Sequence, residues 1–226
     1  MTRIQAPTNS LHRSIKPSGN PMAIGRGNGT ALPRPVISVF GSSQARRGGQ
    51  LYAASHKMGE LLGRAGFDLM TGGYRGVMEA ASRGGHASGA QVTGITLERF
   101  RDQVNPYVMK EIRTASFYER LVWLVDRADG YVAMHGGIGT LAEVTFAWQE
   151  LLLGMVPARP LILVGERWKR TFKSFRGNLI GARAMYRPIV IVATPEQALP
   201  RLLTHFPSGR LKKDFNARAP HSFSPQ

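Results

Sequence analysis

The sequence predicts an α/β fold: a single Rossmann-like, doubly wound parallel sheet with helices on both faces. Short runs that are apolar throughout alternate with helical segments, which is typical of parallel strands buried on both faces. Turns rich in glycine or serine follow three of these runs. With 226 residues, 42% of them hydrophobic, the chain is long enough for one such domain with a buried core.

Apolar runs predict six strands, at residues 35–41, 67–73, 91–97, 129–134, 160–165 and 188–193. Helical patterns predict five helices, at residues 50–66, 77–89, 114–128, 140–154 and 194–203. The first helix is expected to end at Gly66, and the last to begin with Thr194 as N-cap and Pro195 at its first position. The helix at 114–128 is expected to bury Phe117, Leu121, Leu124, Val125 and Ala128. The polar connection at 99–113 lacks clear periodicity and is expected to be a functional loop.

Charge and composition divide the chain into three parts. Residues 35–206 are expected to form the domain, between a disordered basic N-terminal arm (1–34) and a disordered basic C-terminal tail (207–226). The formal net charge is +16, and residues 1–34 hold five Arg/Lys and no acid. Such arms are expected either to be simply solvated or to make weak nucleic-acid contacts.

The chain contains no cysteine, which excludes disulfides, thiolate zinc sites and cysteine nucleophiles and favours a cytoplasmic protein. No apolar run approaches the roughly 18 residues of a membrane span, so no membrane contact is expected. The six histidines lack metal-ligand spacing, and no lysine is placed for a pyridoxal-phosphate Schiff base. We therefore expect neither a metal nor a cofactor.

The stretch MHGGIGTLAEV (134–144) joins a predicted strand to a predicted helix. Glycines allow close approach of the backbone to a ligand, and unpaired N–H groups at a helix start favour an anion. In the alternative interpretation, Thr140 is an N-cap and Glu143 its partner in a capping box. A dinucleotide fingerprint is excluded because the motif follows the fourth strand, and no P-loop lysine is present.

Two other strands end in similar turns. Ser42 and Ser43 follow the first strand, and the turn TGGYRGVME, with Gly73, Arg75 and Glu79, follows the second. Because ligands in parallel α/β sheets bind at the carboxyl ends of strands, the three turns are expected to surround a small phosphorylated ligand.

These segments resemble the LOG family, the cytokinin riboside 5′-monophosphate phosphoribohydrolases with the motif PGGxGTxxE. The resemblance covers about residues 36–200 and rests on HGGIGTLAE, FYERLVWLVDRADG, FGSS and TGGYRGVMEAASRGG. Aligning the family's RKxxM helix places its arginine at Arg120. The chain departs from the family's pattern at His135 (proline), Leu121 (lysine), Leu124 (methionine) and Ala142 (glutamate).

The resemblance implies hydrolysis of the N-glycosidic bond of a nucleoside 5′-monophosphate, of the AMP or cytokinin-riboside-monophosphate type, to free base and ribose 5-phosphate. It implies Arg120 and Glu143 as catalytic residues and a homodimer. The residues expected to bind phosphate and ribose are Ser42, Ser43, Gly136, Gly137, Gly139 and Thr140, with Gly73, Arg75, Glu79 and His135 as further candidates. The alternatives are a non-catalytic carrier of a nucleotide or of molybdenum cofactor, and a nucleic-acid binder acting through the arms.

Overall fold

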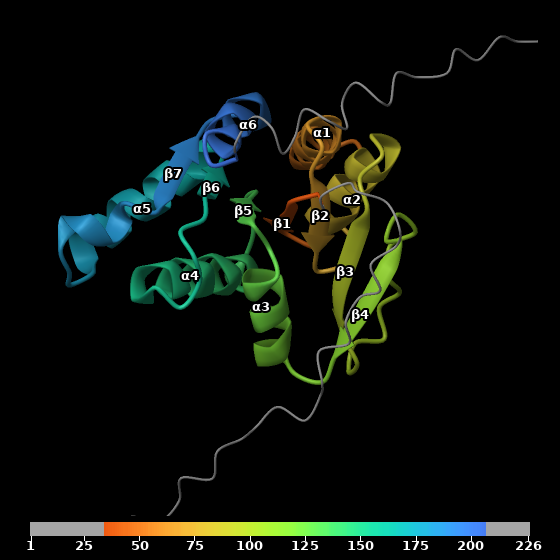
Figure 1. The fold of residues 1–226 in the computed structure, drawn as a ribbon, viewed down its shortest axis with the longest axis horizontal. Helices are drawn as coiled ribbons and strands as arrows, with labels where there is room; N and C mark the ends of the chain where they lie inside the picture. The colour runs from red at the N-terminus through yellow and green to blue at the C-terminus, as the bar shows by residue number, and fades with distance from the viewer. Residues whose placement is uncertain (1–33, 207–226) are drawn as a thin grey trace, which may run out of the picture. The chain divides into compact units, whose positions relative to one another are not determined.

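The computed structural model describes residues 34–206, which form a parallel seven-stranded sheet in the order β4-β3-β2-β1-β5-β6-β7 (Figure 1). The strands are β1 (Val36–Phe40), β2 (Asp68–Thr71), β3 (Val92–Leu97), β4 (Lys110–Thr114), β5 (Gly130–Ala133), β6 (Leu161–Val164) and β7 (Ile189–Val192). The helices are α1 (Gln50–Arg64), α2 (Val77–Ala87), α3 (Phe117–Asp126), α4 (Ile138–Leu153), α5 (Glu166–Asn178) and α6 (Pro195–Leu203), with a 3-10 helix at Arg183–Tyr186. The predicted fold class is confirmed.

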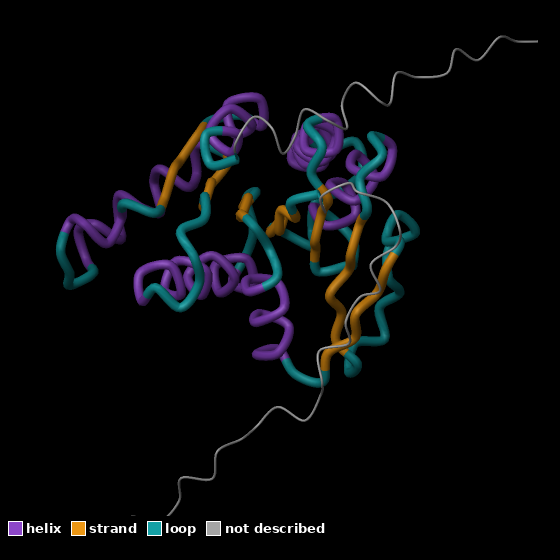
Figure 2. The backbone as a smooth tube through the Cα atoms, viewed as in Figure 1, coloured by secondary structure: helices purple, strands orange, loops and turns teal. Residues whose placement is uncertain are grey.

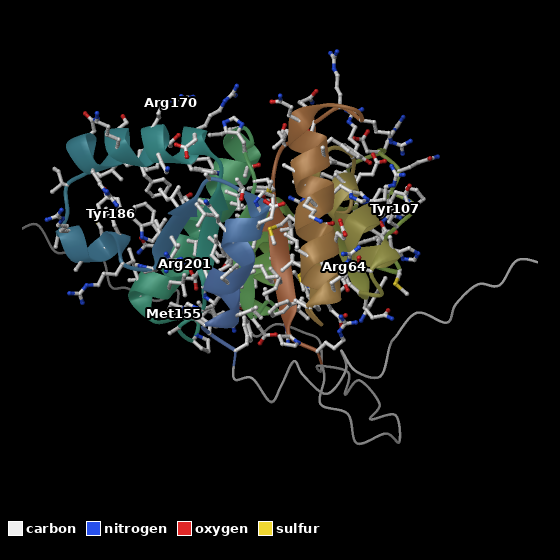
Figure 3. The ribbon with its side chains drawn as sticks, turned by 90° about the horizontal axis from the view of Figure 1, so that it is seen from above. Arg64, Tyr107, Met155, Arg170, Tyr186 and Arg201 are labelled. Carbon is white, nitrogen blue, oxygen red and sulfur yellow. The ribbon has the colours of Figure 1, made fainter. Side chains whose placement is uncertain are left out.

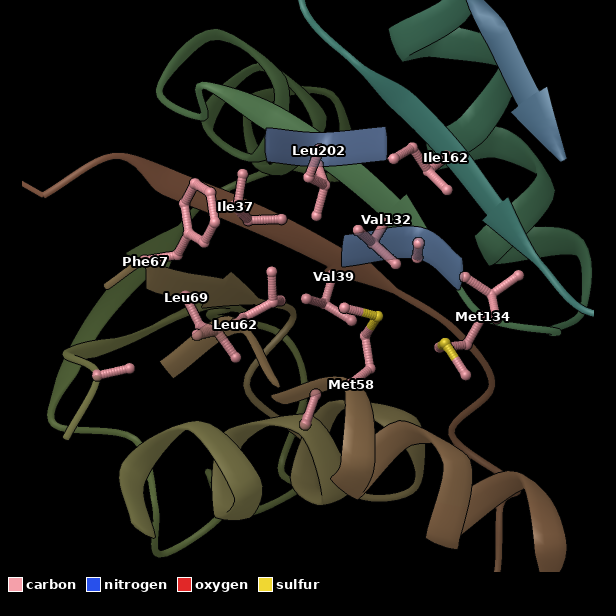
Figure 4. Packing of buried hydrophobic residues seen from close by; sticks show 14 of the residues in the cluster. Ile37, Val39, Met58, Leu62, Phe67, Leu69, Val132, Met134, Ile162 and Leu202 are labelled. Atoms are coloured by element: carbon pink, nitrogen blue, oxygen red, sulfur yellow. The ribbon is translucent and has the colours of Figure 1, made fainter. Parts of the chain in front are cut away.

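The helices cover both faces of the sheet, as the tube in Figure 2 shows. One core lies under α1, α2 and α6 and includes Ile37, Val39, Met58, Leu62, Leu69, Val132, Ile162 and Leu202 (Figure 4). The other lies under α3, α4 and α5 and includes Phe40, Ile95, Leu124, Tyr131, Ala147, Leu161, Trp168 and Phe172. Successive residues of β1 and β5 enter opposite cores, because side chains alternate along a strand.

The winding direction of the sheet reverses at β1. This strand pairs with β2 on one side and with β5 on the other, in the registers Ile37↔Leu69 and Ile37↔Gly130. Crossovers from β1 through β4 therefore run one way and those from β5 through β7 the other. At such a reversal, the connections that leave two adjacent strands run in opposite directions and leave a crevice beyond the carboxyl ends of those strands. Ligands of this fold class bind in that crevice.

Close packing of α1 against α2 places the start of α2 at this crevice. A Cβ atom on Gly59 would collide with the carbonyl of Ala81, and one on Gly84 would collide with the carbonyl of His56. Only glycine therefore allows the two helices to meet at backbone contact.

The sequence-based element assignment was wrong at two places. The connection at 99–113 contains the start of β4, an edge strand whose residues Lys110, Glu111 and Arg113 are exposed. Charged side chains are tolerated there because an edge strand has one unprotected flank, so no apolar run marks it. The segment 166–178, to which no element was assigned, forms α5 and buries only Trp168 and Phe172.

The predicted arms lie outside the described residues except for Arg34, which packs onto the domain. Its guanidinium donates to the carbonyls of Gly66 (2.8 Å) and Gly89 (2.7 Å) and lies 3.5 Å from Asp68. Within residues 34–206, no helix has the length and apolar character needed to cross a membrane.

Candidate active site

A cleft of about 380 Å³ opens at the carboxyl ends of the strands around the β1/β5 switch. Its walls come from the turns after β1, β2, β3 and β5 and from the starts of α2, α3 and α4. The lining residues include Ser42, Ser43, Tyr74, Met78, Leu97, Phe100, Asp102, Phe117, Arg120, Gly137, Ile138, Gly139, Thr140 and Glu143. The fold thus brings together residues that are far apart in the chain.

The glycine turn forms an uncapped helix start on one side of the cleft. Helix α4 begins at Ile138, its N-cap is Gly137, and no side chain accepts a hydrogen bond there. Thr140 is therefore inside the first turn, and the capping-box interpretation was wrong. The first backbone bond of the helix is from Leu141 N to Gly137 O, at 3.0 Å, so the N–H groups of Ile138, Gly139 and Thr140 have no acceptor within the helix. Together with the helix dipole, these donors favour an anion.

Gly136, Gly137 and Gly139 differ in whether the surrounding protein leaves room for a side chain. A Cβ on Gly136 would overlap the hydroxyl of Thr140 and lie 3.0 Å from the backbone N of Ser42. A Cβ on Gly137 or Gly139 would meet nothing within 4 Å. Packing therefore explains Gly136, whereas Gly137 and Gly139 leave open space at the cleft.

The serine turn after β1 is held between β5 and α2. Ser42 N donates to the carbonyl of His135 (3.2 Å), and Val77 N donates to the carbonyl of Ser42 (2.9 Å). The hydroxyl of Ser42 accepts from Gln44 N at 3.0 Å. These bonds fix Ser42 and Ser43 beside the start of α4, where both line the cleft.

Arg120 and Glu143 form a buried ion pair at the bottom of the cleft. The Nη1 atom of Arg120, on α3, lies 3.4 Å from Oε1 of Glu143, on α4, and the two residues are only 7% exposed. Arg120 also donates from Nε to the carbonyl of Ile95 (2.8 Å). A Cβ on Gly72 would collide with its guanidinium, so the glycine after β2 makes room for this side chain. The arginine is therefore held in one position by two elements.

Burial changes the acidity of Glu143. Removal of the carboxyl group from water raises its pKa from 4.5 to about 7, although the nearby charge and hydrogen bond of Arg120 act in the opposite direction. A carboxyl group with this pKa exchanges protons readily near neutral pH, which is the property of a general acid or base.

The four further candidate residues do not line this cleft. Arg75 is exposed, and Glu79 is engaged by Arg47 and by the hydroxyl of Tyr52. The carbonyl of Gly73 accepts from Asn105 N at 2.8 Å, which ties the connection after β3 to the turn after β2.

The fourth of them, His135, faces the other side of the glycine turn, where it lines a separate cavity of about 200 Å³ with Trp168. Its ring centroid lies 6.5 Å from that of Trp168. Burial, with Arg167 and Arg170 nearby, lowers the pKa of His135. Gly136, which was expected to bind phosphate, lines this second cavity as well and not the cleft.

An apolar wall of the cleft was missed by sequence reasoning. Tyr74 and Phe100 pack together with ring centroids 5.7 Å apart. Phe117, the first residue of α3, lines the same cleft. Phe117 was expected to be buried, but it is 43% exposed because it is the first residue of its helix and overhangs the cleft. A signal was present for Phe100, an aromatic residue between Arg99 and Arg101 in the connection after the third predicted strand.

The arrangement combines backbone anion donors, a buried carboxyl–guanidinium pair and an aromatic wall in one cleft. Within residues 34–206, no group of three His, Asp or Glu side chains is placed to hold a metal ion. The site therefore has the chemical parts for binding a phosphorylated ligand with an apolar ring and for moving a proton near its centre.

The chain belongs to the SLOG cluster4 family, whose family model matches residues 34–175. Over 201 residues it is 27% identical to cytokinin riboside 5′-monophosphate phosphoribohydrolase LOG from Oryza sativa subsp. japonica, covering 85% of this chain and 82% of the relative. Over 131 residues it is 25% identical to the cytokinin riboside 5′-monophosphate phosphoribohydrolase of Mycobacterium tuberculosis, covering 57% of this chain and 70% of the relative.

Among solved structures, the chain is similar to the molybdenum cofactor binding protein of Rippkaea orientalis. The TM-score is 0.64 at 24% sequence identity, and the match covers 77% of this chain and 98% of the other. At this identity the likeness establishes the shared fold.

Proposed function

We propose that this protein hydrolyses the N-glycosidic bond of a nucleoside 5′-monophosphate of the AMP or cytokinin-riboside-monophosphate type. The products are the free base and ribose 5-phosphate. The observation that carries the proposal is the buried Arg120–Glu143 pair, 3.4 Å apart, in the same cleft as the uncapped start of α4. The relatives named as phosphoribohydrolases support the same reaction class.

The 5′-phosphate would sit at the start of α4. The N–H groups of Ile138, Gly139 and Thr140 supply donors, and the helix dipole adds a partial positive charge. Ser42, Ser43 and Thr140 line the same cleft, and their hydroxyls would supply further donors to the phosphate. Backbone donors held by a helix bind phosphate without the entropy loss of ordering long side chains.

The ribose would then face Glu143, which lies one turn further along α4. Breaking the glycosidic bond builds positive charge on the sugar, as in glycoside hydrolysis. The Glu143 carboxylate stabilises that charge and takes a proton from the attacking water, while Arg120 holds the carboxylate in position. One water balances the reaction: its hydroxyl bonds to C1′ and a proton ends on the released base.

The base would lie against the aromatic wall of Tyr74, Phe100 and Phe117. Flat rings suit a purine because stacking contributes about 1–3 kcal/mol per base. An exposed apolar wall also accommodates a substituent on the base, as in a cytokinin. Phe100 (52% exposed) and Phe117 (43% exposed) would otherwise present apolar surface to water, whereas Tyr74 is buried behind Phe100.

The proposal is tested by incubating the purified protein with a panel of nucleoside 5′-monophosphates and separating the products by chromatography. We expect adenine from AMP, no base from adenosine, and ribose 5-phosphate in equal amount. Loss of activity on adenosine follows from the phosphate site. Release of inorganic phosphate and intact adenosine from AMP would contradict the proposal, because those are the products of a phosphatase.

The rate is expected to rise with pH through about 7. The pKa of Glu143 is about 7 in the folded protein, and the ionised form is the one that stabilises the cationic sugar. Activity on AMP, measured as kcat/KM from pH 5 to pH 9, should therefore be about a hundredfold lower at pH 5 than at pH 8. A flat profile over this range would remove the proposed role of the Glu143 carboxylate.

Gly137→Ala and Gly139→Ala are expected to raise the KM for AMP at least about tenfold while leaving the melting temperature almost unchanged. Neither added methyl group meets protein atoms within 4 Å, so its cost appears only when phosphate approaches the backbone. Gly136→Ala is the matched contrast: it collides with Thr140 and is expected to lower the melting temperature. Unchanged KM in both of the first two variants would place the phosphate elsewhere.

A second candidate is binding without hydrolysis, as in a carrier. The solved molybdenum cofactor binding protein of similar fold and the departures at Leu121 and His135 favour it. This candidate predicts saturable binding of AMP or of molybdenum cofactor with no release of base. The panel experiment separates the two, because bound AMP is recovered intact from a carrier.

Homodimer formation, cytoplasmic location and nucleic-acid contact through the arms remain predictions. For a dimer, the end of α4 and the residues after it offer an apolar surface, with exposed Leu152, Leu153 and Met155.

A further inference from the structure

Strand β7 leaves one edge of the sheet open. It is the last strand in the sheet order, and among the described strands it pairs only with β6. Its residues Ile189, Val190 and Ile191 are half-buried. The outer edge of a terminal strand carries N–H and C=O groups without a sheet partner, and such an edge accepts an extended peptide as an additional strand.

A cleft of about 360 Å³ lies beside this strand, between β7 and α5. Its floor is apolar, formed by Phe172, Ile189 and Ile191, and its rim carries three cations, Lys169, Lys173 and Arg176. These cations stand at positions i, i+4 and i+7 and therefore share one face of α5. Successive members are about 6 Å and about 4.5 Å apart along the helix axis, and their long side chains can span the difference to the roughly 7 Å between alternate side chains of a strand.

The surrounding surface is strongly basic. Residues 166–187 hold seven Arg/Lys, all of them exposed, and one acid, Glu166. Within the described part of the chain, only Lys169 of these seven pairs with a carboxylate, at 2.7 Å from Glu166. The guanidinium of Arg176 lies over the ring of Tyr186, at 5.3 Å from its centroid. Like charges gathered on one surface attract an acidic partner.

We propose that β7 and α5 form a docking site for an extended acidic segment of another protein. The segment would add to β7 as a further strand and place acidic side chains, at every second position, against Lys169, Lys173 and Arg176. Backbone pairing supplies affinity in this mode of recognition, and the alternating side chains supply specificity.

Charge argues against the chain's own basic segments, or a second copy of the chain, as the occupant of this docking site. Residues 1–34 contain five Arg/Lys and no acid, and residues 207–226 contain one acid, Asp214, among several cations. A second copy joined edge to edge would bring two basic α5 helices together. A nucleic acid or an anionic membrane would use the charges but neither the open edge nor the apolar floor.

The test measures binding of a fluorescent peptide of about nine residues that alternates glutamate with valine, by anisotropy with the full chain. We expect saturable binding with a Kd below about 1 mM. The double substitution Lys173→Glu/Arg176→Glu should weaken it at least about tenfold. Arg201→Glu, on α6 (Figure 3), reverses one charge outside the cleft and should leave the Kd unchanged. Base release from AMP should be the same in all of these variants, so this result is independent of the proposed hydrolysis.

Two further probes decide the mode of binding. The same peptide with N-methyl groups on alternate residues, which blocks pairing with a strand edge, should lose binding at least about tenfold. A single-stranded oligo-dT of equal charge should compete weakly. Equal binding of the methylated peptide, equal competition by oligo-dT, no binding up to about 1 mM, or an unchanged Kd in the double variant would each overturn the proposal.

Discussion

Glu143→Gln is expected to lose about a hundredfold or more of its turnover of AMP while remaining folded. Glutamine keeps the shape of the side chain and a hydrogen-bonding oxygen for Arg120, but it has no charge with which to stabilise a cationic sugar. The loss should appear in kcat, because the proposed phosphate site at the start of α4 is untouched. Glu150→Gln, on the same helix and outside the cleft, is the matched control and should keep full activity.

The same substitution should stabilise the protein above neutral pH. Glu143 has a pKa of about 7 when folded and 4.5 as a free side chain, so the folded state holds its proton more tightly. The contribution of protonated Glu143 to the free energy of unfolding is fully present below pH 4.5 and is lost as the pH rises through about 7. At pH 8 the wild type carries the full cost of a buried charge, on the order of 3 kcal/mol, and glutamine does not.

Chemical denaturation of both proteins at pH 5 and pH 8 checks this expectation. We expect nearly equal free energies of unfolding at pH 5 and a more stable Glu143→Gln variant at pH 8. A variant that is less stable than the wild type at pH 8 would show that the carboxylate supports the fold, and the pair would then be structural.

Arg120→Ala is expected to lower kcat for AMP about a hundredfold at pH 7. The guanidinium is the charge that opposes the effect of burial on Glu143, so its removal raises the pKa of that carboxyl group further. Part of the lost activity should therefore return as the pH is raised to about 9, which loss of a phosphate contact alone would not produce.

Stability should also fall in Arg120→Ala, by on the order of 3 kcal/mol, because a buried side chain and its bond to Ile95 are removed. Arg127→Ala is the control: Arg127 is exposed at the end of α3 and stacks on Trp123, outside the cleft. Equal loss of activity at pH 7 and pH 9 in Arg120→Ala would contradict a role through Glu143.

Much of the fold could be predicted from the sequence because strands buried on both faces must be apolar. The runs at β1, β3, β5 and β6 carry this signal, and the glycine and serine turns mark the ends of β1 and β5. Edge strand β4 carries no such signal, since Lys110, Glu111 and Arg113 face water. Helix α5 was missed because its cations outnumber the few apolar residues that it buries.

The candidate site was predicted in part for a similar reason. Ser42, Gly137 and Glu143 lie in contiguous motifs, and the structure places all three in one cleft. The partnership of Arg120 with Ile95 and Gly72 could not be predicted from local spacing, because it depends on how α3 crosses the sheet. The aromatic wall likewise combines two connections, after β2 and after β3, with the first residue of α3, and only the tertiary fold brings them together.

We propose that the start of α4 holds the phosphate of a nucleotide while Arg120 and Glu143 face its sugar. A crystal structure of Glu143→Gln grown with AMP would show the bound position, because the variant should leave the substrate intact. We expect phosphate oxygens within hydrogen-bond distance of the N–H groups of Ile138, Gly139 and Thr140, and the amide that replaces the Glu143 carboxylate against the ribose. A nucleotide bound with its phosphate away from α4, or with its ribose out of reach of Arg120 and of the substituted side chain, would contradict the account.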